Sequence, residues 1–248
     1  MKLVLLLLAV SSCRSEVVAI ERSYFESYLR EPPPPTQKDS EKHGGGKNAL
    51  SLEYYKWPNG IVPFLFSHGF SVNEQAIILD AINVLQQQTC VYFIPKTPDQ
   101  REHIRFVKSD WGCGSSIGYR RGQVEPLDVT LDDFCLELPG AVQHELLHVL
   151  GLFHEHTRPD RDDYVEVLWE NIEPAYRHNF AKGSWDYMES FGLPYDYGSV
   201  MHYPSYAYAK AGASVTMVSR INSSAPLGQT DGASFYDLQK IRYMYPCP

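Results

Sequence analysis

The segment that most constrains the fold of this chain begins at His144 and reads His-Glu-Leu-Leu-His-Val-Leu-Gly-Leu-Phe-His. On an α-helix, residues four apart are separated by about 40° around the axis, so His144 and His148 project from one face. Gly151 accepts the positive φ that lets a chain leave a helix sharply, and such a turn would bring His154 back toward the pair. The pattern therefore predicts a helix, a sharp turn and three imidazoles around one centre.

Three imidazoles around one centre are typical of a metal site. Zinc favours nitrogen ligands in tetrahedral geometry, and three protein ligands leave a position open for water, as in catalytic sites. Glu145 follows the first His directly and could reach such a water without binding the metal. A bare His-Glu-x-x-His arises by chance about 0.02 times in a chain of this composition, and the added Gly and His lower this to roughly 5 × 10⁻⁵. The alternative, an amphipathic helix with two surface histidines, is therefore disfavoured.

The first residues are typical of a secretory signal peptide, which we place at residues 1–15. Lys2 precedes eight apolar residues, and small polar residues follow before Cys13. The apolar run is too short to cross a bilayer, which needs about 20 residues, and no later segment qualifies. The alternatives are a buried N-terminal helix and a bacterial lipid anchor at Cys13.

Residues 16–47 differ in composition from the rest of the chain. They hold four consecutive prolines at 32–35, a charged run, and three glycines at 44–46 before Lys47. Such runs build no packed core, so the segment is interpreted as an exposed, removable pro-segment. Cleavage after Lys47 would give a mature start at Asn48 or Ala49.

Charge and cysteines narrow the class of protein further. Without residues 1–47 the chain keeps 15 of its 22 Lys and Arg and 24 of its 30 Asp and Glu. This acidic balance argues against nucleic acid and anionic membranes as partners. Four cysteines remain, which predicts two disulfides in a secreted chain and leaves three pairings open. Asn222-Ser-Ser224 is a candidate glycosylation site.

Periodicity predicts four strands and three helices. Ser71 and Glu74 form a capping box, after which Ile77, Ala81, Ile82 and Leu85 recur at helical spacing. Residues 127–131 alternate apolar and polar, as a strand with one buried face should. The predicted strands are 61–66, 91–94, 104–107 and 127–131, and the predicted helices begin at 72, at 139 and at 236, ending near 90, 151 and 245.

Two further motifs reveal a family resemblance. The segment continues Glu155-His-Thr-Arg158-Pro-Asp-Arg-Asp162, and Ser199-Val-Met-His-Tyr203 follows later. Together with the three histidines, these motifs resemble the astacin family of metzincin zinc metalloendopeptidases. The resemblance extends from about Tyr54 to Cys247, and the segments 194–197 and 227–229 are also similar.

The resemblance implies an α+β fold of the metzincin, or zincin-like, type, with a two-lobed catalytic domain over residues 48–248. The upper lobe, about 49–151, would hold a mixed five-stranded sheet and two long helices, so the fifth strand comes from the resemblance alone. The lower lobe, about 152–248, would be largely irregular with a C-terminal helix. The family's disulfide pairing would join Cys90 to Cys247 and Cys113 to Cys135.

The resemblance also implies the role of each site residue. His144, His148 and His154 would bind one Zn²⁺, and Glu145 would act as general base and proton shuttle. Tyr203 would be a displaceable zinc ligand that stabilises the oxyanion, with Met201 as a hydrophobic floor. Glu155 would pair with the α-amino group of the mature N-terminus, and residues 124–131 would be the edge strand that binds substrate. His156 and His202 have no matching ligand position.

The expected protein is a secreted, extracellular, monomeric zinc metalloendopeptidase that hydrolyses protein or peptide substrates through a zinc-activated water. The main alternative is a non-catalytic, zinc-stabilised extracellular binding protein, which would have no need of Glu145. A second alternative is a zinc amidase that acts on non-peptide amides. The family's pro-segment motif Phe-x-Gly-Asp, which silences the zymogen, is matched only by Phe25-Glu-Ser-Tyr28, without Gly or Asp. Latency through Asp39 or Glu41, steric blockage, and the absence of tight latency are the alternatives.

Overall fold

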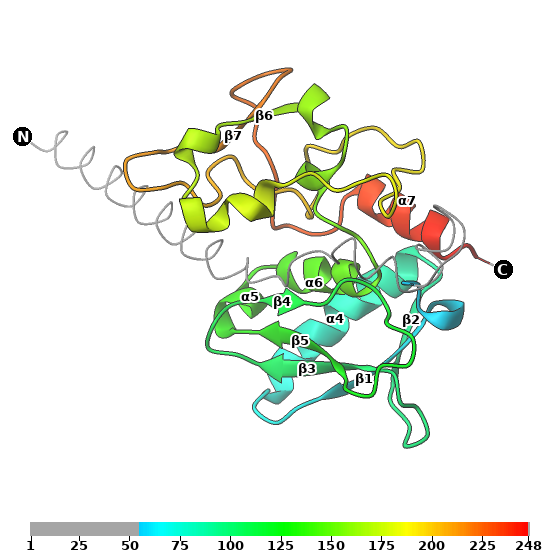
Figure 1. The fold of residues 1–248 in the computed structure, drawn as a ribbon. Coiled ribbons are helices and arrows are strands. Elements are labelled where there is room, and N and C mark those ends of the chain that lie inside the picture. Colours follow the sequence, from blue (N-terminus) through cyan, green and yellow to red (C-terminus); the bar gives the residue numbers. More distant parts are fainter. Residues whose placement is uncertain (1–54, 248) are drawn as a thin grey trace, which may run out of the picture.

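The computed structural model describes residues 55–247 (Figure 1). The predictions made for the signal peptide at 1–15, the pro-segment at 16–47, the cleavage after Lys47 and the domain start at 48 lie outside the described residues. Within the described part, no helix is both long and apolar enough to cross a bilayer.

Short elements alternate with irregular chain along the described range. The strands are β1 (Ile61–Phe66), β2 (Tyr92–Pro95), β3 (Ile104–Lys108), β4 (Gly114–Ser115), β5 (Leu127–Leu131), β6 (Val165–Val167) and β7 (Met217–Ser219). The α-helices are α4 (Val72–Gln88), α5 (Asp133–Glu137), α6 (Ala141–Val149) and α7 (Phe235–Met244). Within the described range there are also the 3₁₀ helices η1 (Pro58–Gly60), η2 (Glu155–Thr157), η3 (Arg161–Asp163), η4 (Trp169–Asn171) and η5 (Pro174–Phe180).

The larger sheet has five strands in the order β2-β1-β3-β5-β4. β1 lies parallel to β2 and β3, and β3 lies parallel to β5, whereas β4 is antiparallel to β5. This arrangement confirms the mixed five-stranded sheet and, with the helices, the α+β class. β6 and β7 form a separate antiparallel pair.

The prediction that residues 124–131 form the edge strand is wrong. β5 lies between β3 and β4, and the edge strand on this side of the sheet is β4. The alternation of buried Leu127, Val129 and Leu131 shows which face of the strand is covered, but it carries no information about neighbours in the plane of the sheet. β4 has only two residues and therefore leaves no pattern in the sequence.

The helices α4 and α6 pack against each other and against the sheet. α4 begins with the predicted capping box, in which the Ser71 hydroxyl accepts from the Glu74 backbone N–H and the Glu74 carboxylate accepts from that of Ser71. Ile77 is 40% exposed, contrary to the predicted buried stripe, and Ile78 takes its place in the core. Every residue of α6 is buried.

The chain after Gly151 forms a second lobe on the side of α6 away from the sheet (Figure 1). It is built mostly of turns and 3₁₀ helices, with the β6–β7 pair and α7. Disulfides join Cys90 to Cys247 and Cys113 to Cys135, the pairing implied by the resemblance. The first ties the C-terminal end of α7 to the end of α4, so α7 is anchored beside the sheet lobe.

Candidate metal centre

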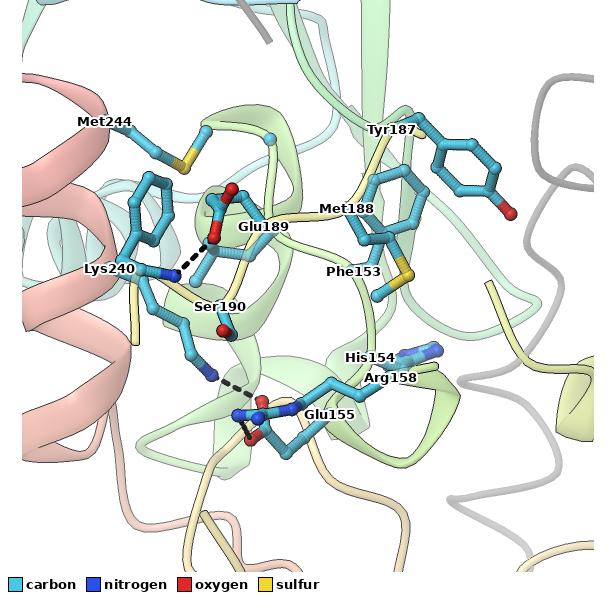
Figure 2. Close-up of a pocket in the computed structure, with 13 residues that line it drawn as sticks. Phe153, His154, Glu155, Arg158, Tyr187, Met188, Glu189, Ser190, Lys240 and Met244 are labelled. Carbon is cyan, nitrogen blue, oxygen red and sulfur yellow. Dashed lines mark hydrogen bonds and ion pairs between the residues drawn. The ribbon is translucent and has the colours of Figure 1, made fainter. Parts of the chain in front are cut away.

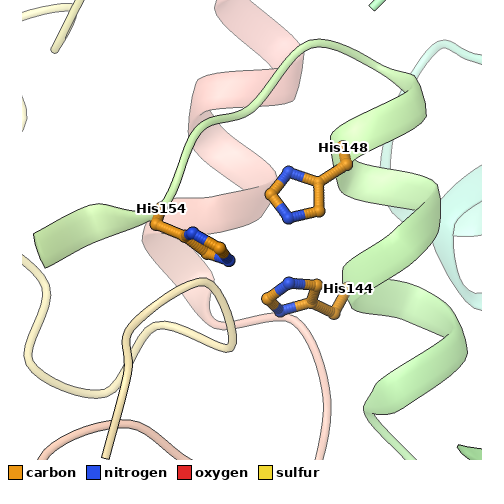
Figure 3. A group of neighbouring side chains, drawn as sticks. All are labelled: His144, His148 and His154. Carbon is orange, nitrogen blue, oxygen red and sulfur yellow. The ribbon is translucent and has the colours of Figure 1, made fainter. Parts of the chain in front are cut away.

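Three histidines meet where the two lobes join. His144 and His148 lie one turn apart on α6, and His154 immediately precedes η2. Gly151 has φ +109°, and its N–H donates to the His148 carbonyl at 2.8 Å, which closes the turn between the helix and His154. One nitrogen of each ring lies within 4.8 Å of the other two, and the rings point toward a common centre (Figure 3).

Main-chain carbonyls orient two of these rings. Nδ1 of His144 donates to the Val200 carbonyl and Nδ1 of His148 to the Leu152 carbonyl, both at 2.7 Å. Because a carbonyl only accepts, each neutral ring carries its lone pair on Nε2. Burial, together with the neighbouring His148, lowers the pKa of His144 well below its usual value. The ring therefore stays in the neutral form that a metal requires.

The cluster fits zinc by its donor chemistry. All three side chains are buried, with exposed fractions of 5% or less. Nitrogens within 4.8 Å of one another are close enough for the three rings to bind one ion, and imidazole nitrogen is a ligand that zinc prefers. Imidazoles suit zinc and other transition metals, and they exclude the oxygen-seeking Ca²⁺ and Mg²⁺.

Glu145 follows the first ligand on α6 and is 1% exposed. Its backbone carbonyl accepts from the Ser115 hydroxyl of β4 at 3.0 Å. This bond fixes the edge strand directly beside the helix that carries the histidines. The edge of the sheet, Glu145 and the cluster are therefore neighbours, an arrangement that the sequence did not predict because Ser115 belongs to no recognisable motif.

Tyr203 packs against the cluster from the second lobe. Its ring centroid lies 4.5 Å from that of His154, and the ring of His156 stacks on it at 3.8 Å with an interplanar angle of 29°. His156 lies outside the histidine cluster, and its Nε2 donates to the Asn179 carbonyl at 3.1 Å. His156 thus supports the Tyr203 ring.

His202 is likewise outside the cluster. Its Nδ1 donates to the Tyr203 carbonyl at 2.6 Å, and its Nε2 accepts from the Tyr195 hydroxyl at 2.7 Å. Burial lowers the pKa of His202, so this ring is neutral and its two hydrogen bonds hold the turn in place.

The turn at residues 199–201 is hydrogen-bonded both to His144 and to the segment that carries His154. Met201 is 1% exposed, its N–H donates to the Ser199 hydroxyl at 2.9 Å, and its carbonyl accepts from the Glu155 N–H at 2.9 Å. Val200 in the same turn holds His144. The turn therefore connects the α6 ligand to the segment that carries His154.

Glu155 has a buried carboxylate surrounded by donors. It pairs with Arg158 at 3.1 Å and with Lys240 of α7 (Figure 2). It also accepts from the Asp196 N–H at 2.9 Å. The predicted partner, a matured N-terminus, lies outside the described residues. Glu155 also lines a pocket, together with the apolar Phe153, Met188 and Met244 and the charged Glu189.

A helix with His-Glu-x-x-His beside a mixed sheet, followed by a third His at a turn, defines the zincin class of metal-binding domains. The comparison with family models is more specific. Residues 49–246 match the model of the Astacin peptidase family, and the chain belongs to this family.

The chain is similar to several curated proteins. It is 34% identical over 203 residues to zinc metalloproteinase nas-4 of Caenorhabditis elegans, covering 82% of this chain and 63% of the relative. It is 37% identical over 205 residues to zinc metalloproteinase nas-13 of the same species, covering 83% and 44%. Bone morphogenetic protein 1 of Xenopus laevis is 36% identical over 195 residues, with 77% and 27% covered. The chain thus spans less than two thirds of each of these relatives.

Solved structures agree with the fold. High choriolytic enzyme 1, a hatching enzyme zinc-protease from Oryzias latipes, superposes with a TM-score of 0.72 at 32% identity, covering 83% of this chain and 100% of that chain. Myroilysin superposes with a TM-score of 0.56 at 19% identity, covering 82% and 100%, and supports the fold alone.

Proposed function

We propose that this chain is a secreted zinc-dependent endopeptidase in which His144, His148 and His154 hold one zinc ion. The observation that carries the proposal is the convergence of three buried imidazoles within 4.8 Å, with Glu145 next to the first of them. The family supports it, and so do the relatives nas-4 and nas-13, both named as zinc metalloproteinases.

Each site residue is proposed to have a separate role in peptide hydrolysis. Zinc, when bound, supplies Lewis acidity that lowers the pKa of water at the site toward ~7, from 15.7 in bulk. Glu145 accepts a proton from the attacking water and passes it to the leaving amine. The Tyr203 hydroxyl donates to the oxyanion that develops on the scissile carbonyl. Met201, which is 1% exposed, is proposed as a hydrophobic floor beneath the ligands that would keep bulk water from that side.

The substrate is proposed to bind along β4 and not along residues 124–131. One edge of β4 pairs with β5, and the Ser115 bond to the Glu145 carbonyl places the strand beside the catalytic helix. A peptide that adds to the sheet at this edge would run past Glu145 in extended form, exposing its backbone carbonyls to attack. Protein and peptide chains are therefore the proposed substrates, and the chain acts as a monomer.

Secretion, maturation and glycosylation belong to the same proposal. Two disulfides suit an oxidising, extracellular compartment, which supports a signal peptide at 1–15. Removal of a pro-segment at 16–47 is proposed to follow. The amino group freed at residue 48 or 49 would approach Glu155 through the pocket beside it. Asn222 is exposed, as a glycosylated side chain must be.

Replacing Glu145 with Ala tests the mechanism. The three imidazoles remain, so the variant should bind one equivalent of zinc but lose nearly all turnover of casein. The exposed Glu137→Ala serves as the matched control and should cleave casein at the wild-type rate. A Glu145→Ala protein as active as the wild type would refute the assigned role.

A chelator separates the enzyme from the binding-protein alternative. Proteolysis that stops on zinc removal and returns on zinc addition supports the enzyme. A folded, zinc-loaded wild type that cleaves no peptide in a random library would favour a non-catalytic role in which the metal serves folding alone.

A further inference from the structure

Helix α7 carries two buried charged side chains that the proposed mechanism does not use. Asp237 is fully buried and Lys240 is 6% exposed. Residues three apart lie on the same face of a helix, so both point from α7 in one direction. A buried charge is costly unless it is paired, so the contacts of these two side chains indicate what the helix is built to hold.

Asp237 holds the residue that orients His144. Its carboxylate accepts from the Ser199 hydroxyl at 2.6 Å and from the Val200 N–H at 3.0 Å. The carbonyl of the same Val200 accepts from Nδ1 of His144 at 2.7 Å. A chain of two hydrogen bonds therefore runs from α7 through Val200 to the first ligand.

Lys240 holds the residue that follows His154. Its ammonium group pairs with the buried Glu155 carboxylate, opposite Arg158 (Figure 2). The Glu155 N–H donates to the Met201 carbonyl at 2.9 Å, so this residue is fixed at its side chain and at its backbone. Because Glu155 follows His154 directly in the chain, fixing Glu155 also fixes the backbone position from which the His154 side chain extends.

We infer that Asp237 and Lys240 are positioning residues, through which α7 sets the orientation of His144 and His154 for the metal. The inference rests on the proposed zinc site and assigns the C-terminal helix a part in it. Partners that orient a ligand from outside the metal's own shell typically account for about 10–100-fold in metal affinity. The disulfide from Cys90 to Cys247 keeps α7 in register by tying its end to α4.

The test compares charge-removing variants of the full chain by their zinc affinity, measured in competition with a chromogenic chelator. Lys240→Met and Asp237→Asn should each weaken zinc binding about 10–100-fold, and Lys240→Arg should recover most of the loss. The control is Arg242→Met, which removes a cation from the same helix. Arg242 donates to the Gln88 carbonyl at 2.7 Å, away from the metal, so zinc affinity should stay at the wild-type value.

A purely structural role predicts a different result. Lys240→Met and Asp237→Asn would then lower the melting temperature while zinc affinity stayed unchanged, and this outcome overturns the inference. If Lys240→Met does not fold, the zinc affinity of Lys240→Gln, which keeps a polar end group without the charge, is measured instead. A wild type that binds no zinc would instead refute the proposed function, so the two failures are distinguishable.

Discussion

At the scale of single residues, the candidate site depends on main-chain atoms as much as on side chains. The carbonyls of Val200 and Leu152 decide which nitrogen of His144 and of His148 faces the metal. Such hydrogen bonds raise the basicity of the ligand and fix the plane of its ring. Any residue can supply a carbonyl, so these partners leave no mark in the sequence, whereas the ligands themselves were predictable from their spacing.

Tyr203→Phe tests the hydroxyl at the site. The ring packs against His154 and stacks on His156, so phenylalanine should keep the packing and the zinc content. The lost donor to the oxyanion should lower kcat by about 10²–10³, less than the loss in Glu145→Ala, with little change in KM. Steady-state kinetics on a fluorogenic peptide measure both constants.

Tyr176→Phe is the matched control for this variant. Tyr176 stacks on Tyr208 on the surface of the second lobe and is 40% exposed, so kcat should not change. A Tyr203→Phe protein with wild-type kcat would remove the hydroxyl from the mechanism.

At the scale of elements, length decided what could be predicted. The four predicted strands and three predicted helices appear within about two residues of their expected ends, because each is long enough to show its period. α5 was missed, since its five residues are held by the Asp132 cap and the Cys135 disulfide. β4 was missed because two residues are too few to show a period.

Gly151→Ala tests the turn that returns His154 to the cluster. At φ +109° an alanine is strained, and its Cβ would lie 2.8 Å from the flexible end of Met244. Strain of this kind costs about 1–3 kcal/mol. We expect a lower melting temperature and weaker zinc binding, since relief of the strain would move His154.

Gly212→Ala separates backbone strain from effects on the metal. Gly212 has φ +85° with no atom within 4 Å of the added Cβ, and it lies outside the metal-binding segment. It should lower stability but leave zinc affinity intact. Equal zinc affinity in both alanine variants would show that the turn at Gly151 tolerates the change.

The start of α4 gives a prediction about acid stability. Hydrogen bonds from Lys108 and Ser71 lower the pKa of Glu74 to about 2. Because this pKa lies below its ordinary value of 4.5, the contribution of Glu74 is present above pH 4.5 and is lost as the pH falls toward 2. Glu74→Gln should be less stable than the wild type at pH 6, and the difference should vanish near pH 2. Urea unfolding across this range measures it; a constant difference would contradict the assignment.

At the scale of the whole molecule, the site is assembled from distant parts of the chain. α6 contributes two histidines, and the turn at 199–201 and helix α7 of the second lobe hold them in place. The family resemblance correctly predicted two lobes and both disulfides, yet the contacts between the lobes were not predictable. They join residues such as Val200 and Asp237 whose identities, taken one by one, are ordinary for a core turn and a helix N-terminus.

The disulfide from Cys90 to Cys247 should therefore matter more than the one from Cys113 to Cys135. The first closes a sequence separation of 157 residues and the second one of 22, so chain entropy gives roughly 5 and 3 kcal/mol. The first also anchors α7, on which the proposed orientation of His144 and His154 depends. Replacing both members of each pair with serine should lower the melting temperature in both proteins, but only the Cys90/Cys247 variant should also bind zinc more weakly. The Cys113/Cys135 variant is the internal control, because it loses a bridge within the sheet lobe. Equal zinc affinity in the two folded variants would mean that α7 keeps its place without the bridge, and that packing of its buried face alone positions Asp237 and Lys240.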